Sequence, residues 1–170
     1  MLKLYALGAG LALCCLAGCQ ADLQTPAVLP VYRPLLMPRA ALEQAVALLP
    51  ARPLHRPGKK LYQGSFLLIN ERYEGIHIID NQDPTQPQAV GFMRIPGSVD
   101  FAVRGPLLYA DNAVDLLTID VSNATAPRVL HRTRAVLPEL PLPELATVEP
   151  GYRTDNRPPD ALVVGWQKVE

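Results

Sequence analysis

The sequence contains very few cysteines and histidines. The three cysteines among 170 residues are Cys14, Cys15 and Cys19. Because all of them lie within the first nineteen positions, the rest of the chain has no disulfide framework, no cysteine metal cluster and no cysteine nucleophile. The three histidines are His55, His77 and His131, and no two of them have the spacing of metal ligands. A histidine within an apolar run, such as His77, is typical of a packed, hydrogen-bonded side chain.

An excess of charge of one sign is also missing. Sixteen Lys and Arg residues balance sixteen Asp and Glu residues, and no basic block is longer than Lys59-Lys60. Nucleic-acid binding requires a concentrated basic surface, so we expect no nucleic-acid partner. The densest basic stretch, "HRTR" at 131–134, places Arg132 and Arg134 on one face of a strand, which we interpret as a solvated face.

Motifs for catalysis and cofactor binding are lacking as well. The serines outside the first nineteen residues are Ser65, Ser98 and Ser122, and none stands in a G-x-S-x-G elbow. The clustered acids Asp100, Asp111 and Asp115 lack the spacing of a calcium loop, which favours turn capping for them. We therefore predict no catalytic, cofactor-binding or metal-binding residue, and no enzymatic activity. A binding face remains an alternative role for four aromatic residues, Tyr73, Tyr109, Tyr152 and Trp166, although a core position suits the lone tryptophan better.

The first feature that the sequence does contain is a predicted signal peptide at residues 1–18. The positive charge of Lys3 precedes the apolar run 4–16, and small residues follow, which is the pattern of a secretory signal peptide. The run is shorter than the roughly 20 apolar residues of a membrane-spanning helix. The segment "LAGC" at 16–19 resembles the lipobox of bacterial lipoproteins; an ordinary signal peptide with chance cysteines is the alternative.

The lipobox resemblance implies that the chain is cut before Cys19 and that this cysteine is acylated, for example with palmitate. Two or more acyl chains hold a protein stably on a membrane, whereas one binds only marginally. Gln20 follows the cysteine, where an aspartate would imply retention in an inner membrane. The expected location is therefore the cell envelope, on the outer membrane, facing the periplasm or the cell surface.

Residues 19–57 are rich in proline, with seven prolines between 26 and 57. Because proline fixes φ and removes a backbone donor, most of this stretch is expected to be an extended, lipid-anchored linker. One segment interrupts it near 39–49. After Pro38, the spacing of Leu42, Ala45, Val46 and Leu49 predicts a short amphipathic helix that ends before the next proline.

From residue 58 onward, short apolar runs alternate with Gly, Pro, Asn and Asp clusters, which predicts strands separated by turns. The expected strands are 60–63, 65–70, 75–80 and 90–95 in a first set, and 99–104, 107–111, 116–120 and 129–134 in a second. No helix separates them, so we predict an all-β fold of antiparallel sheets with two repeats, 58–96 and 97–135. Residues 136–170 are expected to form a proline-rich segment and a last strand at 162–166.

The two sets of strands are copies of one unit. Shifted by forty, residues 67–90 align without a gap on residues 107–130, and the identical pairs include Leu67/Leu107 and Ile79/Ile119. Four strands per ~40 residues is the period of a propeller blade. Alternation places Ile76 on one face of its strand and His77 on the other. Both faces are largely apolar, as expected for a blade between two neighbours.

A polar, proline-bound turn follows the same strand in each repeat. We assign its side chains to strand termination and turn capping rather than to a binding site. These turn residues are Asp80, Asp83, Pro84, Pro87, Asp120, Asn123 and Pro127.

These turns and the strands before them resemble the LVIVD-repeat family of secreted or lipid-anchored bacterial proteins. The hallmark is a hydrophobic "L-x-I-x-D" strand followed by a "D/N-P-x-x-P" turn. Residues 76–80 and 83–87 carry it here, and residues 116–120 and 123–127 carry a weaker copy. The wider resemblance, over most of 38–166, is to the N-terminal region of lipoproteins from Bacteroidetes-type bacteria. It implies propeller-type repeats.

Members of that group are typically longer, and a closed propeller needs about four blades or more. We therefore expect a short or truncated member, with a homodimer or a small capped β-sandwich as alternatives. The leading functional hypothesis is a non-enzymatic binding or scaffold module for an envelope protein or a glycan. The alternatives are the N-terminal part of a larger propeller enzyme, of hydrolase or lyase type, and an inactive fragment.

Overall fold

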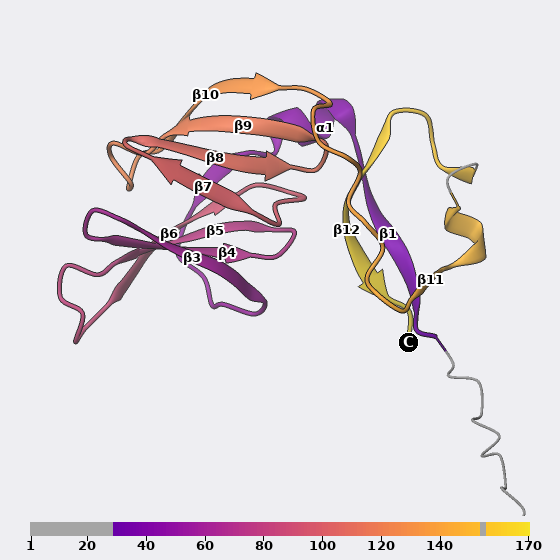
Figure 1. Ribbon diagram of the computed structural model, residues 1–170, viewed down its shortest axis with the longest axis horizontal. Coiled ribbons are helices and arrows are strands. Elements are labelled where there is room, and N and C mark those ends of the chain that lie inside the picture. The colour runs from indigo at the N-terminus through magenta and orange to yellow at the C-terminus, as the bar shows by residue number, and fades with distance from the viewer. Residues whose placement is uncertain (1–28, 154–155) are drawn as a thin grey trace, which may run out of the picture.

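The computed structural model describes residues 29–153 and 156–170, and its secondary structure is mostly β (Figure 1). A five-stranded sheet has the order β2 (Ala47–Leu49), β6 (Gln88–Arg94), β5 (Gly75–Asp80), β4 (Phe66–Glu71) and β3 (Pro57–Gln63). A four-stranded sheet has the order β10 (Arg128–Thr133), β9 (Asp115–Asp120), β8 (Leu107–Asn112) and β7 (Phe101–Arg104). A three-stranded sheet has the order β11 (Thr147–Val148), β1 (Val31–Pro38) and β12 (Ala161–Lys168).

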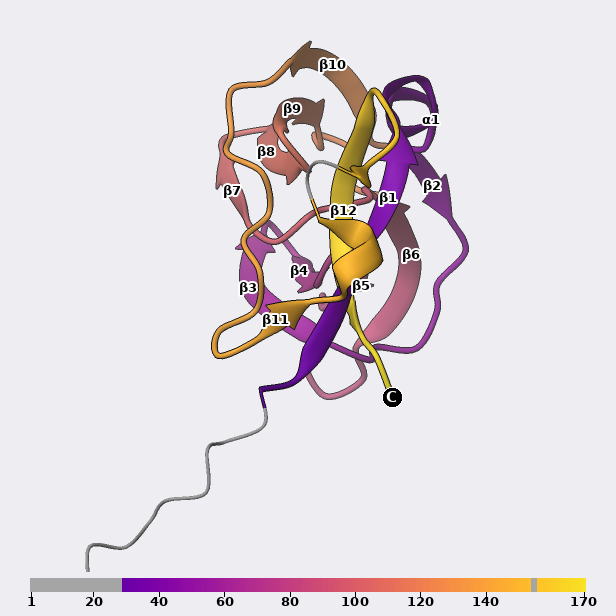
Figure 2. The same cartoon turned by 90° about the vertical axis from the view of Figure 1, so that its right-hand side faces the viewer.

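The two larger sheets are antiparallel, and they lie one above the other (Figure 1). The three-stranded sheet stands against one end of both, as the view along that end shows (Figure 2).

The prediction of a mostly β fold with antiparallel sheets is confirmed. In the part of the chain that the structure describes, the sheets do not close into a propeller ring. No helix of the described residues is long and apolar enough to span a membrane.

The two repeats form strands at matching positions. All eight expected strands are present, and the same backbone hydrogen bonds recur between them. The N–H of Asn81 donates to the Ser65 carbonyl at 2.8 Å, and the N–H of Val121 donates to the Pro106 carbonyl at 2.8 Å. Gly64 and Gly105 both have φ of +57° in the turn before β4 and β8, a conformation that favours glycine.

The gapless alignment at a shift of forty is wrong for one strand. In the first repeat Phe66 pairs with Asp80, whereas in the second Leu107 pairs with Asp120. Leu107 is therefore the counterpart of Phe66 rather than of Leu67, and β8 is displaced by forty-one residues from β4. The cause is the turn between the strands, because three residues separate β4 from β5 but two separate β8 from β9.

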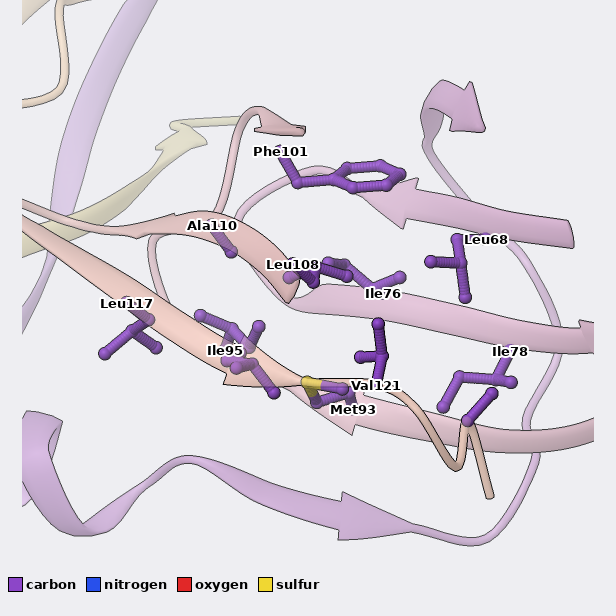
Figure 3. Close-up of a cluster of buried hydrophobic side chains, with 12 residues drawn as sticks. Leu68, Ile76, Ile78, Met93, Ile95, Phe101, Leu108, Ala110, Leu117 and Val121 are labelled. Carbon is purple, nitrogen blue, oxygen red and sulfur yellow. The ribbon is translucent and has the colours of Figure 1, made fainter. Parts of the chain in front are cut away.

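The main core lies between the two larger sheets, and the repeats contribute opposite faces to it. The first repeat buries Ile76 and Ile78 of β5, whereas the second buries Leu117 and Ile119 of β9. Figure 3 shows Ile76, Ile78 and Leu117 among the side chains of this core cluster. The positions equivalent to Ile76 and Ile78 at a shift of forty are Leu116 and Thr118, which lie half-buried on the outer face of the four-stranded sheet.

The outer face of the five-stranded sheet is covered by the chain segment that precedes β3. The Arg52 guanidinium lies 4.1 Å from the centre of the Phe92 ring, and it pairs with Glu74. His77 is packed against Phe92 with ring centroids 4.8 Å apart, and its Nε2 lies 3.0 Å from the Glu71 carboxylate. The prediction that His77 is a packed, hydrogen-bonded histidine is confirmed.

Residues 31–38 form strand β1, so the expectation of an extended linker is wrong for them. β1 pairs antiparallel with β12 along its length, but it pairs with β11 only at Val31 and Tyr32. Beyond Tyr32 that edge of β1 has no partner strand, and an edge without a partner tolerates proline. The expected last strand is present and is longer than predicted, because β12 extends over Ala161–Lys168.

The expected helix near 39–49 is shorter than predicted. Helix α1 covers Arg39–Gln44, and its one buried side chain is Leu42, which packs with Ala113 and Val164. The following residues form strand β2, in which Leu48 pairs with Met93 of β6. Pairing with the open edge of β6 satisfies the backbone of 47–49, and a short isolated helix offers little to compete with it.

A buried carboxylate joins α1 to the four-stranded sheet. Asp115, whose side chain is 0% exposed, accepts hydrogen bonds from Arg39 at 2.7 and 2.6 Å, from Arg132 at 2.7 Å and from the Ala135 N–H at 3.0 Å. Burial raises the pKa of Asp115, but the hydrogen bonds from Arg39, Ala135 and Arg132 outweigh burial and hold the pKa below its ordinary value.

This network corrects two expectations. Arg132 does not lie on a solvated face, because its side chain is 12% exposed and binds Asp115 and the Asn112 side chain. Arg134 is mostly exposed, and it pairs with Glu43 of α1 at 2.7 Å. Asp115 forms a buried ion pair with two arginines in addition to accepting the Ala135 N–H of the turn after β10, so turn capping is only part of its role.

We predict that Asp115→Asn lowers the free energy of unfolding by roughly 3 kcal/mol at neutral pH, because two arginines lose their buried partner. The lowered pKa means that ionised Asp115 stabilises the fold above the ordinary carboxyl pKa of about 4. That contribution is lost as the pH falls through the lowered pKa. Chemical denaturation of wild type and variant should therefore show a stability gap that narrows between pH 7 and pH 3.

The matched control is Asp83→Asn, because the second repeat already has asparagine, Asn123, at this turn position with equivalent hydrogen bonds. The control should lose far less stability than Asp115→Asn. Equal losses in the two variants, or a gap that widens on acidification, would contradict the role assigned to Asp115.

Candidate functional site

The turn between β4 and β5, residues 72–74, lies where the two larger sheets meet the three-stranded sheet. Tyr73 has a positive φ of 69°, and its N–H donates to the Ser98 carbonyl at 2.6 Å. Its carbonyl accepts from the Gly97 N–H at 2.9 Å. Such a backbone costs of order 1–3 kcal/mol and persists only when the surroundings hold it. Ala113 has φ of 58° in the corresponding turn, so both repeats use this conformation.

The Tyr73 side chain extends from the turn to the three-stranded sheet. Its ring lies against Gly165 of β12, where a Cβ atom would be 3.1 Å from the Tyr73 Cγ atom. Glycine at 165 therefore allows the close approach. The guanidinium of Arg72 lies 5.0 Å from the centre of the Tyr73 ring, within the range of a cation–π contact.

Two cavities adjoin this turn, and Arg72 and Tyr73 line both. The first, here called the arginine cavity, has a volume of about 390 Å³ and is lined by Tyr32, Arg56, Arg72, Tyr73, Pro143, Glu144 and Trp166. The second, here called the proline cavity, has a volume of about 230 Å³ and is lined by Arg72, Tyr73, Val99, Asp111, Ala113 and residues 137–141. The arginine cavity lies within the size range of small-molecule sites.

The buried carboxylate of Glu71 determines where Arg56 lies. Glu71 is the last residue of β4, and it accepts hydrogen bonds from the backbone N–H groups of His55 and Arg56. The Arg56 carbonyl in turn accepts from the Arg72 N–H at 3.1 Å. The backbone segments that carry Arg56 and Arg72 are thus joined beside the cavity.

Burial raises the pKa of Glu71, whereas the hydrogen bonds from the His55 and Arg56 N–H groups and from His77 lower it. The hydrogen bonds outweigh burial, so the pKa of Glu71 lies below its ordinary value. Glu71 therefore remains ionised over the neutral range, and it keeps its hold on the backbone of residues 55–56.

The arginine cavity combines positive charge with aromatic surface. Among the described residues, no carboxylate lies within 4.0 Å of the Arg56 or Arg72 guanidinium. Glu144 contributes one negative charge to the same lining. Trp166 is 4% exposed, and its indole N–H donates to the Leu140 carbonyl at 3.2 Å, so this aromatic residue offers only ring surface.

The proline cavity has a carboxyl group at its edge. Burial raises the pKa of Asp111, although hydrogen bonds from the Val99 and Asp100 N–H groups oppose that shift. These bonds place Asp111 in a backbone-capping role. Its surroundings are mainly proline and leucine side chains from 137–141.

Sequence reasoning identified part of this lining. Of the four aromatic residues considered for a binding face, the structure brings Tyr73 and Trp166 together at the arginine cavity. Tyr109 lines a separate groove with Leu116 and Leu137, and Tyr152 lies exposed beyond β11.

Besides Pro143, four polar or aromatic lining residues were missed, namely Tyr32, Arg56, Arg72 and Glu144. Tyr32 lay in the proline-rich stretch interpreted as a linker. The other three are charged residues in loops, where no local pattern indicates a common site. Only Arg72 had a recognisable context in the sequence, because it stands next to Tyr73 at the end of an apolar strand.

The predicted turn residues lie at the opposite end of the two larger sheets from the cavities. Asp80 and Asp120 accept hydrogen bonds at 2.9 Å from the N–H groups two residues ahead, Gln82 and Ser122. Asp83 and Asn123 accept from Thr85 and Thr125 in the same way, through both the backbone N–H and the hydroxyl. The prolines of these turns are Pro84, Pro87 and Pro127.

Among the other residues considered for chemistry, Asp100 and Asp111 lie together, since the Asp100 N–H donates to the Asp111 carboxylate. His55 and His131 are exposed, and Ser98 is buried against Asn70. Among the residues that the structure describes, no three His, Cys, Asp or Glu side chains are grouped so as to hold a metal ion. Cys19, predicted to be lipidated, lies outside the described residues.

Comparison with known protein families, curated proteins and solved structures finds no match to this chain. The resemblance to LVIVD repeats therefore stays a prediction.

Proposed function

We propose that this protein is a non-enzymatic binding module of the cell envelope, anchored to the outer membrane through a lipidated Cys19. The arginine cavity carries this proposal. It combines two arginines without carboxylate partners among the described residues, three aromatic side chains and one glutamate. Sites for small molecules join apolar and aromatic walls to a few well-placed polar groups in this way. The ligand would be an envelope component, with the chain acting as a rigid scaffold.

The manner in which the repeats pack supports a propeller-like arrangement as part of the proposal. Consecutive blades of a propeller are related by rotation about a common axis, so one blade presents one face and its neighbour presents the other. Here Ile76 and Ile78 of the first repeat share one core with Leu117 and Ile119 of the second, which belong to the opposite face of the repeat. A sandwich of two repeats related by a two-fold axis would bury the same face twice.

The rigidity of the cavity also favours binding. Tyr73 is held by backbone hydrogen bonds on both sides and by its contact with Gly165, and Arg56 is held through Glu71. A site whose walls are fixed before the ligand arrives loses less conformational entropy on binding.

For the anchor, we predict that Cys19→Ala abolishes stable membrane partitioning, because the acylated thiol is lost. The measurement is detergent extraction and sedimentation of membranes from cells, combined with labelling by radioactive palmitate. Cys15→Ala is the control, because Cys15 lies within the predicted signal peptide, and its loss should leave membrane partitioning unchanged. Unchanged partitioning of Cys19→Ala would refute the anchor.

For binding, we predict that a screen of small saccharides, peptides and carboxylates finds ligands that raise the melting temperature of the full chain in detergent. A ligand at about 100 times its Kd stabilises a protein by about 2.7 kcal/mol. For a chain of this size such a gain corresponds to several degrees. Arg72→Gln should abolish the shift, because it removes the charge that the two cavities share.

Arg104→Gln serves as the matched control, because Arg104 ends β7, is exposed and lines neither cavity. The control should keep the ligand-induced shift. A screen without any stabilising ligand, or shifts that persist in Arg72→Gln, would contradict a binding function for this site.

A further inference from the structure

The arginine cavity also indicates which kind of ligand it takes. We propose that it binds a sugar residue that carries a single carboxylate, such as a uronic acid unit of an envelope glycan. This inference rests on the proposed binding function and adds to it the chemical class of the ligand. It follows from the charge, the aromatic surface and the size of the cavity.

Charge favours a monoanion. Arg56 and Arg72 contribute two positive charges to the lining, and Glu144 contributes one negative charge, which leaves one charge to be neutralised. A dianion such as a phosphate monoester would bring a second negative charge to a cavity that already contains the Glu144 carboxylate, and like charges repel. A carboxylate matches the planar guanidinium and accepts two parallel hydrogen bonds from it.

Aromatic surface favours a ring with an apolar face. Trp166 uses its one polar hydrogen on the Leu140 carbonyl, so it offers the cavity only ring carbon atoms. Tyr73 is held against Gly165 and is half-buried, so part of this residue remains accessible at the cavity. The C–H faces of a pyranose ring are apolar and pack well against such surfaces, while the hydroxyl groups at its edge remain free to form hydrogen bonds.

The remaining polar groups suit these hydroxyl groups. The Glu144 carboxylate accepts hydrogen bonds, and the phenol groups of Tyr32 and Tyr73 can both donate and accept. A simple aliphatic or aromatic carboxylate would satisfy the arginines but would offer no hydroxyl group to the exposed Glu144 carboxylate, which would then bind only water. A volume of about 390 Å³ fits one or two sugar rings rather than a longer folded segment.

The chain provides its own probe of this cavity. Trp166 is its only tryptophan, so intrinsic tryptophan fluorescence reports on the cavity wall. We predict that glucuronate changes this fluorescence saturably when it is titrated into the full chain in detergent. Glucose has the same ring without the charge, and it should require at least about ten-fold higher concentration, because a charge-assisted hydrogen bond is worth about 1.5–3 kcal/mol. Glucose 6-phosphate should also bind more weakly than glucuronate.

Variants test the two arginines separately. Arg56→Gln and Arg72→Gln should each weaken glucuronate binding about ten-fold or more, whereas Arg104→Gln should leave it unchanged. The Arg56 and Arg72 side chains are exposed, so the variants should fold, and their unfolding followed by the same fluorescence verifies this.

Equal affinity for glucose and glucuronate, or equal weakening in Arg104→Gln, would overturn the inference. Failure of all acidic sugars, while other ligands of the broader screen still depend on Arg72, would also overturn it. In that last case the binding function itself would stand.

Discussion

Ile76 and Ile78 of the first repeat share one apolar core with Leu117 and Ile119 of the second, and this core determines where the rest of the chain lies. Burial of such side chains is worth roughly 1.5–3 kcal/mol each, so the interface outweighs any single polar contact in the molecule. Because the contact joins opposite faces of the repeat, the turns after β4 and β8 are brought to the same end of the structure. The three-stranded sheet then packs on that end through Leu42, Tyr73 and Trp166.

The candidate site depends on this arrangement at every step. The turn that carries Arg72 and Tyr73 lies beside β12 because the larger sheets are stacked, and Glu71 at the end of β4 places Arg56 next to it. Residues 137–144 then run across the opening and complete both cavities. The site thus combines parts from the start, the middle and the end of the described chain, and no isolated repeat contains it.

Much of the fold could be predicted from the sequence, because local patterns determine it. Alternating apolar residues and Gly, Pro, Asn and Asp turns located all eight strands of the repeats, and the recurrence of Asp80 as Asp120 identified the repeat. The proline-rich stretch 31–38 was misinterpreted, since the partner that makes it a strand lies more than a hundred residues away in β12. Arg132 was misplaced for the same reason: its buried partner Asp115 is recognisable only once the sheets and α1 are assembled.

The candidate site was less predictable than the fold. Tyr73 and Trp166 were recognised as candidate binding residues, but nothing local relates them to Arg56 or Glu144. Strand β8 lies forty-one residues after β4, but the chance identity of Leu67 and Leu107 favoured an alignment at forty. A turn that is shorter by one residue leaves the run of apolar residues intact, so the sequence did not reveal the difference.

Methyl–methyl nuclear Overhauser effects can show which faces of the two repeats meet in the core. In a sample with labelled Ile, Leu and Thr methyl groups, the methyl groups of Ile76 and Ile78 should show cross-peaks to methyl groups on the buried face of the second repeat, which carries Leu108, Leu117 and Ile119. Cross-peaks from Ile76 and Ile78 to Leu116 and Thr118 instead would mean that equivalent faces meet, and they would contradict the packing on which the site depends.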